Sequence, residues 1–209
     1  MPDREPLNRE RIVAAALALA DTDGVDALSM RTLAARLGCA PMSLYNHVAD
    51  KDELLTAMLE AVADEIEPLA PDRDPLDAIR VRAISTREAL VRHRWAAELW
   101  QRAALGPART RLMEELLAML ARTDLSPEVA HHGFHAVNNH VLGYTLQELG
   151  MNMGKDPERT ARDFQKAIVA DFPLMAAHIQ QHLDGDTSRT FELVLDLILE
   201  GLVRLDGEG

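Results

Sequence analysis

The chain has 209 residues, of which 47% are hydrophobic and 4% aromatic, and its formal net charge at pH 7 is −12. This length suffices for one large domain or two small ones with a buried core, and the single cysteine, Cys39, excludes an intramolecular disulfide framework. No apolar run reaches the roughly 18 residues of a membrane-spanning helix, and the N-terminal residues lack an apolar secretion signal. We therefore expect a soluble, cytoplasmic protein with no membrane partner.

The first predicted helix follows Asn8, a residue type that favours helix N-termini, and ends at Gly24. Apolar residues recur at helical spacing between them. This predicted buried stripe consists of Ile12, Ala15, Ala16 and Leu19.

The stretch from Ser29 to Lys51 predicts two short helices joined by a tight turn. Ser29 is a good N-cap, and Gly38 is placed to end the first helix in a left-handed conformation. The second helix, roughly Pro41 to Val48, has Leu44 and Val48 as its firm apolar anchors. Its remaining residues are polar or semi-polar and are predicted to face outward: Met42, Ser43, Tyr45, Asn46 and His47.

A short helix with an outward hydrogen-bonding face, braced by a preceding helix, is the helix-turn-helix arrangement that reads a DNA major groove. Within this stretch three cations stand against one carboxylate, so it is locally basic although the chain is acidic. The alternative interpretation is an ordinary helical hairpin in an all-α core. The exposed donors favour the DNA-binding interpretation, because a structural hairpin has no reason to present them.

A fourth helix is predicted from the cap Asp50, with Glu53 three residues later, to about Glu67. Lys51 lies in its first turn, where the ammonium and the helix N-terminus together favour a phosphate. A proline-rich stretch from Pro68 to Pro75 then marks the clearest boundary in the chain. We therefore expect a DNA-binding domain at residues 7–67 and a second domain at residues 75–209.

The second domain has a helical pattern throughout, so the predicted fold class is all-α. Helices are predicted at about 75–93, 94–105, 107–123, 127–149, 157–170, 173–183 and 187–205. The last is apolar on nearly all sides from Phe191 to Leu205, so more than one side needs to be covered. We expect helices 127–149 and 187–205 to form a four-helix bundle with their symmetry mates in a homodimer. A wholly intramolecular core is the alternative.

Two histidine pairs, His131/His135 and His178/His182, have the i,i+4 spacing that places both imidazoles on one helix face. No further ligand occurs at a recognised metal-site spacing, so we predict no metal and no cofactor. The first pair instead belongs to a mixed polar and apolar stripe suited to a pocket wall for a small-molecule effector. The candidate pocket residues from this reasoning are His131, His135, Asn138 and Leu142, with Met113 and Met175 as adaptable lining. Filling of core gaps is the alternative role for the methionines.

The run from Leu7 to Leu59 also resembles the N-terminal DNA-binding domain of the tetracycline repressor (TetR) family. The matching motifs are G-V-D-A-L-S, R-x-L-A-x-x-L-G, L-Y-x-H-V and K-x-E-L-L, in order. The resemblance implies a dimeric all-α repressor that a small ligand releases from DNA. Carried over by position, the implied DNA contacts are Arg31, Pro41, Met42, Ser43, Tyr45, Asn46, His47 and Lys51. Pro41, Met42 and Asn46 differ from the tetracycline repressor and imply a different operator.

The C-terminal half resembles the same repressor in A-V-N-N-H-V-L-G-Y-T-L-Q-E-L, its interface helix, and in F-E-L-V-L-D-L-I-L-E-G-L, its last helix. Gln147 stands where that repressor has a glutamate for a metal-bound water, which makes Gln147 a further candidate pocket residue. No histidine between Trp95 and Gly106 matches its magnesium ligand, so tetracycline–magnesium is not the expected effector.

We therefore expect a homodimeric, ligand-responsive repressor of a palindromic double-stranded operator, and not an enzyme. Two alternatives remain: an all-α metal-dependent enzyme that uses the C-terminal histidines, and a helical dimer module with a non-functional DNA headpiece.

Overall fold

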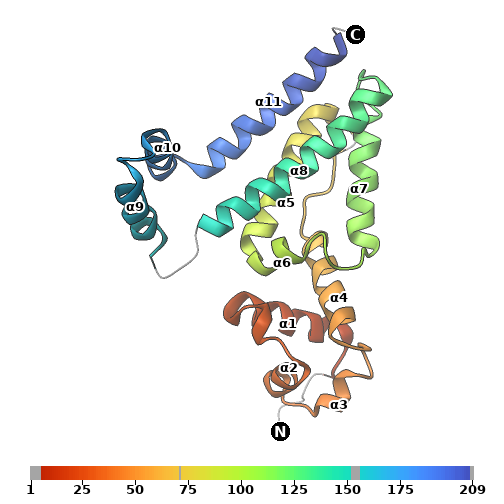
Figure 1. The fold of residues 1–209 in the computed structure, drawn as a ribbon. Coiled ribbons are helices and arrows are strands. Elements are labelled where there is room, and N and C mark those ends of the chain that lie inside the picture. Colours follow the sequence, from red (N-terminus) through yellow and green to blue (C-terminus); the bar gives the residue numbers. More distant parts are fainter. Residues whose placement is uncertain (1–5, 71, 152–155, 208–209) are drawn as a thin grey trace. The chain divides into compact units, whose positions relative to one another are not determined.

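The structure, a computed structural model, describes residues 6–70, 72–151 and 156–207. Over these residues the chain forms helices and no strand, which confirms the predicted all-α fold with a helix-turn-helix near the N-terminus and a larger helical region after it (Figure 1). In chain order the elements are α1 (Arg9–Asp23), the short 3₁₀ helix η1 (Val25–Ala27), α2 (Met30–Leu37), α3 (Pro41–Leu44), α4 (Lys51–Asp64), α5 (Pro75–Arg92), α6 (Arg94–Leu99), α7 (Pro107–Leu120), α8 (Pro127–Met151), α9 (Pro157–Ile168), α10 (Pro173–Asp184) and α11 (Thr187–Gly207).

Backbone contacts divide the chain into two compact units. Unit 1 comprises Met1–Pro68 and Glu88–Glu115, and unit 2 comprises Leu69–Arg87 and Leu116–Gly209. Unit 1 therefore holds α1 to α4 together with the end of α5, all of α6 and the first part of α7. The proline-rich boundary is thus only one of three places where the chain passes from one unit to the other.

Side-chain caps fix the helix starts in the N-terminal part of unit 1. The Asn8 side chain accepts from the Arg11 N–H at 2.8 Å, and Asp50 accepts from the Glu53 N–H at 2.8 Å. Ser29 accepts from the Thr32 N–H at 3.1 Å while its own N–H donates to the Thr32 hydroxyl at 2.9 Å. Each cap satisfies a backbone donor that the helix itself leaves unpaired.

Apolar side chains from α1, α2, α3 and α4 meet in the core of this part. Gly38 ends α2 with a φ of 65°, in the left-handed region that favours glycine. The fully buried members include Ile12, Ala16, Leu33, Leu44, Leu54, Met58 and Leu59. Burial of this one face leaves the opposite side of α3 in solvent.

Helices α3 and α6 end four and six residues before their predicted ends. Helix α3 stops at Leu44, because His47 N–H bonds back to the Leu44 carbonyl at 2.9 Å and tightens the remainder into a turn. Helix α6 stops at Leu99, where the Arg102 N–H bonds back to the Leu99 carbonyl at 3.0 Å and tightens the chain into a turn.

Unit 2 is built around helices α5, α8 and α11, with the second part of α7. Helices α8 and α11 lie side by side (Figure 1). Gly133 permits their close approach, since a Cβ there would lie 2.9 Å from the Leu202 Cδ1. The buried core residues are Ala78, Ile79, Ala83, Leu116, Met119, Leu120, Val137, Val141, Phe191, Leu195, Leu199 and Leu202.

Helix α11 buries only part of its apolar surface within the chain. Leu193, Leu197, Val203 and Leu205 are each at least half exposed. Among the described residues, no helix is long and apolar enough to cross a membrane.

Candidate nucleic-acid interface and effector region

Helix α3 presents its side chains from a firmly anchored backbone. Leu44 and Val48 are fully buried, and Pro41 occupies the first position of the helix, where its missing N–H is not needed. Between these anchors Met42 is 73% exposed and Tyr45 is 44% exposed. The exposed residues between Leu44 and Val48, and those before Leu44, can therefore contact a partner without displacing the two buried anchors.

The predicted DNA contacts lie in three adjacent elements. Arg31 is in the first turn of α2 and Lys51 in the first turn of α4, and both are exposed. Those of α3 and its following turn are exposed or half-buried: Pro41, Met42, Ser43, Tyr45, Asn46 and His47.

Sequence reasoning missed Arg9, which holds the end of the recognition segment. Its Nη1 donates to the His47 carbonyl at 2.8 Å and to the Glu53 carboxylate at 2.6 Å. Arg9 therefore joins α1, the turn after α3 and the start of α4. No local pattern reveals this role, because His47 lies 38 residues away in the chain.

Glu53 also accepts from the Ala49 N–H at 2.6 Å. This hydrogen bond, followed by that from Arg9, holds the pKa of Glu53 below its usual value. Two carboxylates close to Lys51 along the chain, those of Asp50 and Glu53, are thus engaged with backbone N–H groups. This arrangement reduces their opposition to an approaching phosphate.

The predicted effector residues lie on different helices and differ in burial. Met113 is on α7 in unit 1, whereas the others belong to unit 2, where Met175 is exposed on α10. On α8, the Leu142 side chain is buried and the Asn138 side chain is half-buried. Asn138 donates to the Phe134 carbonyl at 2.9 Å. The other predicted residues of α8 are exposed: His131, His135 and Gln147. The rings of His131 and His135 meet edge to face, with centroids 4.8 Å apart.

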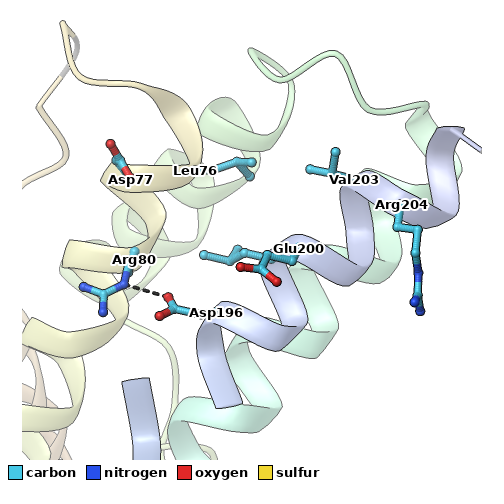
Figure 2. A pocket seen from close by; sticks show the side chains of 8 residues that line it. Leu76, Asp77, Arg80, Asp196, Glu200, Val203 and Arg204 are labelled. Carbon is cyan, nitrogen blue, oxygen red and sulfur yellow. Dashed lines mark hydrogen bonds and ion pairs between the residues drawn. The ribbon is translucent and has the colours of Figure 1, made fainter. Parts of the chain in front are cut away.

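An open groove of about 420 Å³ lies between α5 and α11 (Figure 2). It combines apolar walls with both signs of charge, and none of the predicted pocket residues lines it. Arg80 is held there by Asp196 and Glu192, each at 2.7 Å, and these hydrogen bonds raise its pKa. The lining consists of Leu76, Asp77, Arg80, Asp196, Leu199, Glu200, Val203 and Arg204.

A second polar group surrounds the buried ring of Phe191. His140 stacks on this ring with centroids 4.6 Å apart, and its Nε2 lies 2.9 Å from the Phe191 carbonyl. Burial lowers the pKa of His140. The Arg87 guanidinium lies over the same ring, 5.3 Å from its centroid. It also forms a bidentate ion pair with the Glu148 carboxylate, with N···O distances of 2.7 and 3.0 Å. Sequence reasoning did not single out these residues, because they come from three helices.

The histidines do not gather further ligands. Within residues 6–70, 72–151 and 156–207, no three His, Cys, Asp or Glu side chains are placed to hold a metal ion.

Comparison with known proteins identifies the two regions. The family model described as "Bacterial regulatory proteins, tetR family" matches residues 12–58. The model described as "Tetracyclin repressor-like, C-terminal domain" matches residues 67–205. Together they cover the helix-turn-helix and the larger helical region.

Named relatives are similar over nearly the whole chain. An HTH-type transcriptional regulator of Saccharopolyspora erythraea is 31% identical over 205 residues, which cover 96% of this chain and 86% of the relative. The HTH-type transcriptional repressor DrrR1 of Streptomyces coeruleorubidus is 30% identical over 226 residues, covering 96% and 80%. The crystal structure of the Streptomyces coelicolor TetR family protein ActR in complex with actinorhodin matches with a TM-score of 0.77 at 30% identity, covering 97% and 99%. This chain therefore belongs to the TetR family of bacterial helix-turn-helix transcriptional regulators.

Proposed function

We propose that the chain is a homodimeric repressor that binds a palindromic operator and leaves it when a small-molecule effector binds. The observation that carries the proposal is the exposed face of α3 on a helix-turn-helix whose anchors, caps and turn are all in place. A buried Leu44 beside exposed Met42 and Tyr45 is the pattern of a recognition helix.

The DNA contacts divide into two kinds. Arg31, Tyr45 and Lys51 supply donors for phosphate oxygens, which position a protein without specifying sequence. Asn46 offers an amide for an adenine edge, and Met42 an apolar contact for a thymine methyl. Pro41, Ser43 and His47 complete the proposed contact set.

Exposed apolar surface on α8 and α11 supports the homodimer. Leu193 and Leu197 on α11 and Leu146 on α8 are 54%, 68% and 41% exposed. A Cβ added at Gly143 of α8 would meet nothing within 4 Å, which leaves room for a partner helix to approach closely. A two-fold dimer built on these helices would present two recognition helices to half-sites about 34–36 Å apart.

The effector proposal rests on the relative ActR, whose structures contain actinorhodin or (S)-DNPA. We propose that a small molecule acts on this chain in the same general way. The proposed contacts are the predicted pocket residues of unit 2, namely His131, His135, Asn138, Leu142, Gln147 and Met175. Actinorhodin serves as the first probe: added to the operator complex, it should lower DNA affinity, and His135→Ala should weaken that response.

Selection of DNA from a random double-stranded pool tests the central claim. The full chain should enrich a palindrome, and sedimentation of the complex should give two chains per DNA. A Leu197→Glu variant serves as the control, because a charge on the apolar side of α11 should prevent dimerisation and weaken operator binding. A dimer that enriches no DNA would overturn the repressor proposal and favour a helical dimer module.

A further inference from the structure

The groove between α5 and α11 takes no part in the function proposed above. Its volume of about 420 Å³ lies within the range of about 300–1,000 Å³ that is usual for small-molecule sites in proteins. Both walls belong to unit 2, since residues 76–80 of α5 and 196–204 of α11 lie in that unit. The residues proposed to contact DNA or the effector do not line it. The groove is therefore available to a separate ligand.

An ion-pair contact between the two helices, which we call the brace, fixes one end of the groove. The Arg80 guanidinium of α5 donates to Asp196 and to Glu192 of α11, each at 2.7 Å. These bonds hold α5 and α11 at a fixed separation beside the groove, so the groove is preformed. Because two carboxylates share one guanidinium, the brace itself carries an excess of negative charge.

Beyond the brace the groove has apolar walls. Leu199 is 6% exposed and belongs to the core of unit 2, whereas Val203 is 50% exposed. Leu76 is partly buried against the same core. Figure 2 shows Leu76 and Val203 pointing toward one another from the two helices. A ligand that covers the exposed part of these walls removes apolar surface from water, so the groove suits a ligand with an apolar body.

The carboxylates of the groove are less neutralised than its cations. Among the described residues, the side chains of Asp77 on α5 and Glu200 on α11 accept no hydrogen bond and form no ion pair. Arg80 is already shared by the two carboxylates of the brace. Arg204 is the other cation of the lining, and Figure 2 shows its side chain pointing away from α5. The groove therefore presents a negative field to a ligand.

The helix ends at the groove also favour a cation over an anion. A helix N-terminus attracts anions through its unpaired N–H groups. At the start of α5, however, the Asp74 carboxylate already accepts from the Leu76 N–H at 3.0 Å and from the Asp77 N–H at 3.1 Å. The other wall includes the last two turns of α11, which ends at Gly207, and the C-terminal end of a helix carries partial negative charge.

The groove lies on a different side of α11 from the surface proposed for the homodimer. Leu197 directly follows Asp196, so the two side chains leave the helix about 100° apart. Leu193 lies about one turn before Leu197 and shares its side of the helix. A partner helix on Leu193 and Leu197 therefore leaves the α5 side of α11 accessible to a small molecule.

We propose that the groove between α5 and α11 binds an organic cation with an apolar body, at a site separate from the proposed effector residues. The positive charge lies between the carboxylates of Asp77 and Glu200. The apolar body covers Leu76, Leu199 and Val203. This recognition uses unit 2 alone, so it does not depend on DNA binding.

Tetraphenylphosphonium and tetraphenylborate are matched probes for this site, because they share size and shape and carry opposite charges. Equilibrium dialysis against the full chain, without DNA, measures the affinity of each. We expect one tetraphenylphosphonium per chain, bound about tenfold more tightly than tetraphenylborate. Equal affinity for the two probes, or no binding of the cation, would overturn the proposal.

The charge requirement is tested by the double variant Asp77→Asn, Glu200→Gln. It removes both carboxylates with little change in shape, and we expect tetraphenylphosphonium affinity to fall about tenfold. Glu128→Gln is the matched control, because it makes the same change on α8 at a side chain that is 86% exposed and outside the groove. The control should leave the affinity unchanged. An affinity that is equal in the double variant and the wild type would contradict the proposal.

Val203→Phe tests the shape requirement. It fills part of the groove while keeping every charge, and it should also lower tetraphenylphosphonium affinity. His135→Ala should leave this affinity unchanged, because His135 belongs to the proposed effector residues. Loss of binding in His135→Ala, with none in the groove variants, would move the cation out of the groove and refute the site. A chain that binds the cation but selects no DNA would refute the repressor proposal alone.

Discussion

The buried ion pair of unit 2 allows a quantitative test of how this fold is stabilised. Arg87 and Glu148 are 7% and 9% exposed at their side chains, and two hydrogen bonds of 2.7 and 3.0 Å join them. Arg87 also donates to Ser188 at 3.3 Å, and Glu148 accepts from Thr187 at 3.3 Å. The pair therefore connects α5, α8 and the first turn of α11.

Glu148→Gln should destabilise the protein strongly. The change leaves the Arg87 cation in a site with little water, with the Ser188 hydroxyl as its other acceptor. Removal of one member of a buried pair costs about 3–5 kcal/mol. With a urea m-value of about 2–3 kcal/mol per M, the unfolding midpoint should fall by about 1.5 M.

The double variant Arg87→Met, Glu148→Met should recover most of this loss. Two apolar side chains of similar length remove both charges, and such replacements are often neutral within about 1–2 kcal/mol. Urea unfolding at a fixed protein concentration measures all variants, because dimerisation makes the midpoint depend on concentration.

Arg80→Met is the matched control in the same unit. Arg80 also bonds two carboxylates, but the three side chains are 32–39% exposed, so water can solvate what remains and the loss should be about 1 kcal/mol or less. A loss below about 1 kcal/mol for Glu148→Gln, or a double variant as unstable as the sum of its single changes, would refute the reasoning.

Three further predictions concern DNA and pH. Lys51→Ala should weaken binding to all DNA sequences and reduce the slope of log affinity against log salt by about one unit; an unchanged slope would remove Lys51 from the interface. Asn46→Ala should relax base preference at one position in each half-site, with a loss of about 1–3 kcal/mol on the selected operator, whereas an equal loss on random DNA would show that Asn46 reads no base. Burial lowers the pKa of His140 in the folded chain below its ordinary value of 6.5. Below pH 6.5 the unfolded chain therefore binds a proton at this histidine more readily than the folded chain does. The free energy of unfolding should be greatest above pH 6.5 and should decrease as the pH falls below that value. His140→Phe retains an aromatic ring beside Phe191 and should reduce the difference in Tm between pH 7.5 and 5.5; an unchanged difference would show that other groups cause the acid loss.

Features that depend on neighbouring residues could be predicted from the sequence alone. The caps at Asn8, Ser29 and Asp50 act within three residues of their partners, and Gly38 ends α2 because of its own backbone freedom. Helical periodicity and the apolar excess on α11 likewise require only the order of residues. These local rules were sufficient for the all-α class and the helix-turn-helix.

Tertiary structure alone decided the contacts between distant helices. Arg9 reaches a carbonyl 38 residues away, Arg109 reaches Glu60 across 49 residues, and Arg87 reaches Glu148 across 61. Arg109 also donates to the carbonyls of Trp100 and Ala104, beyond the end of α6. The sequence has no periodicity from which the partner of a charged side chain can be predicted. A buried ion pair forms only where packing brings two helices together and excludes water.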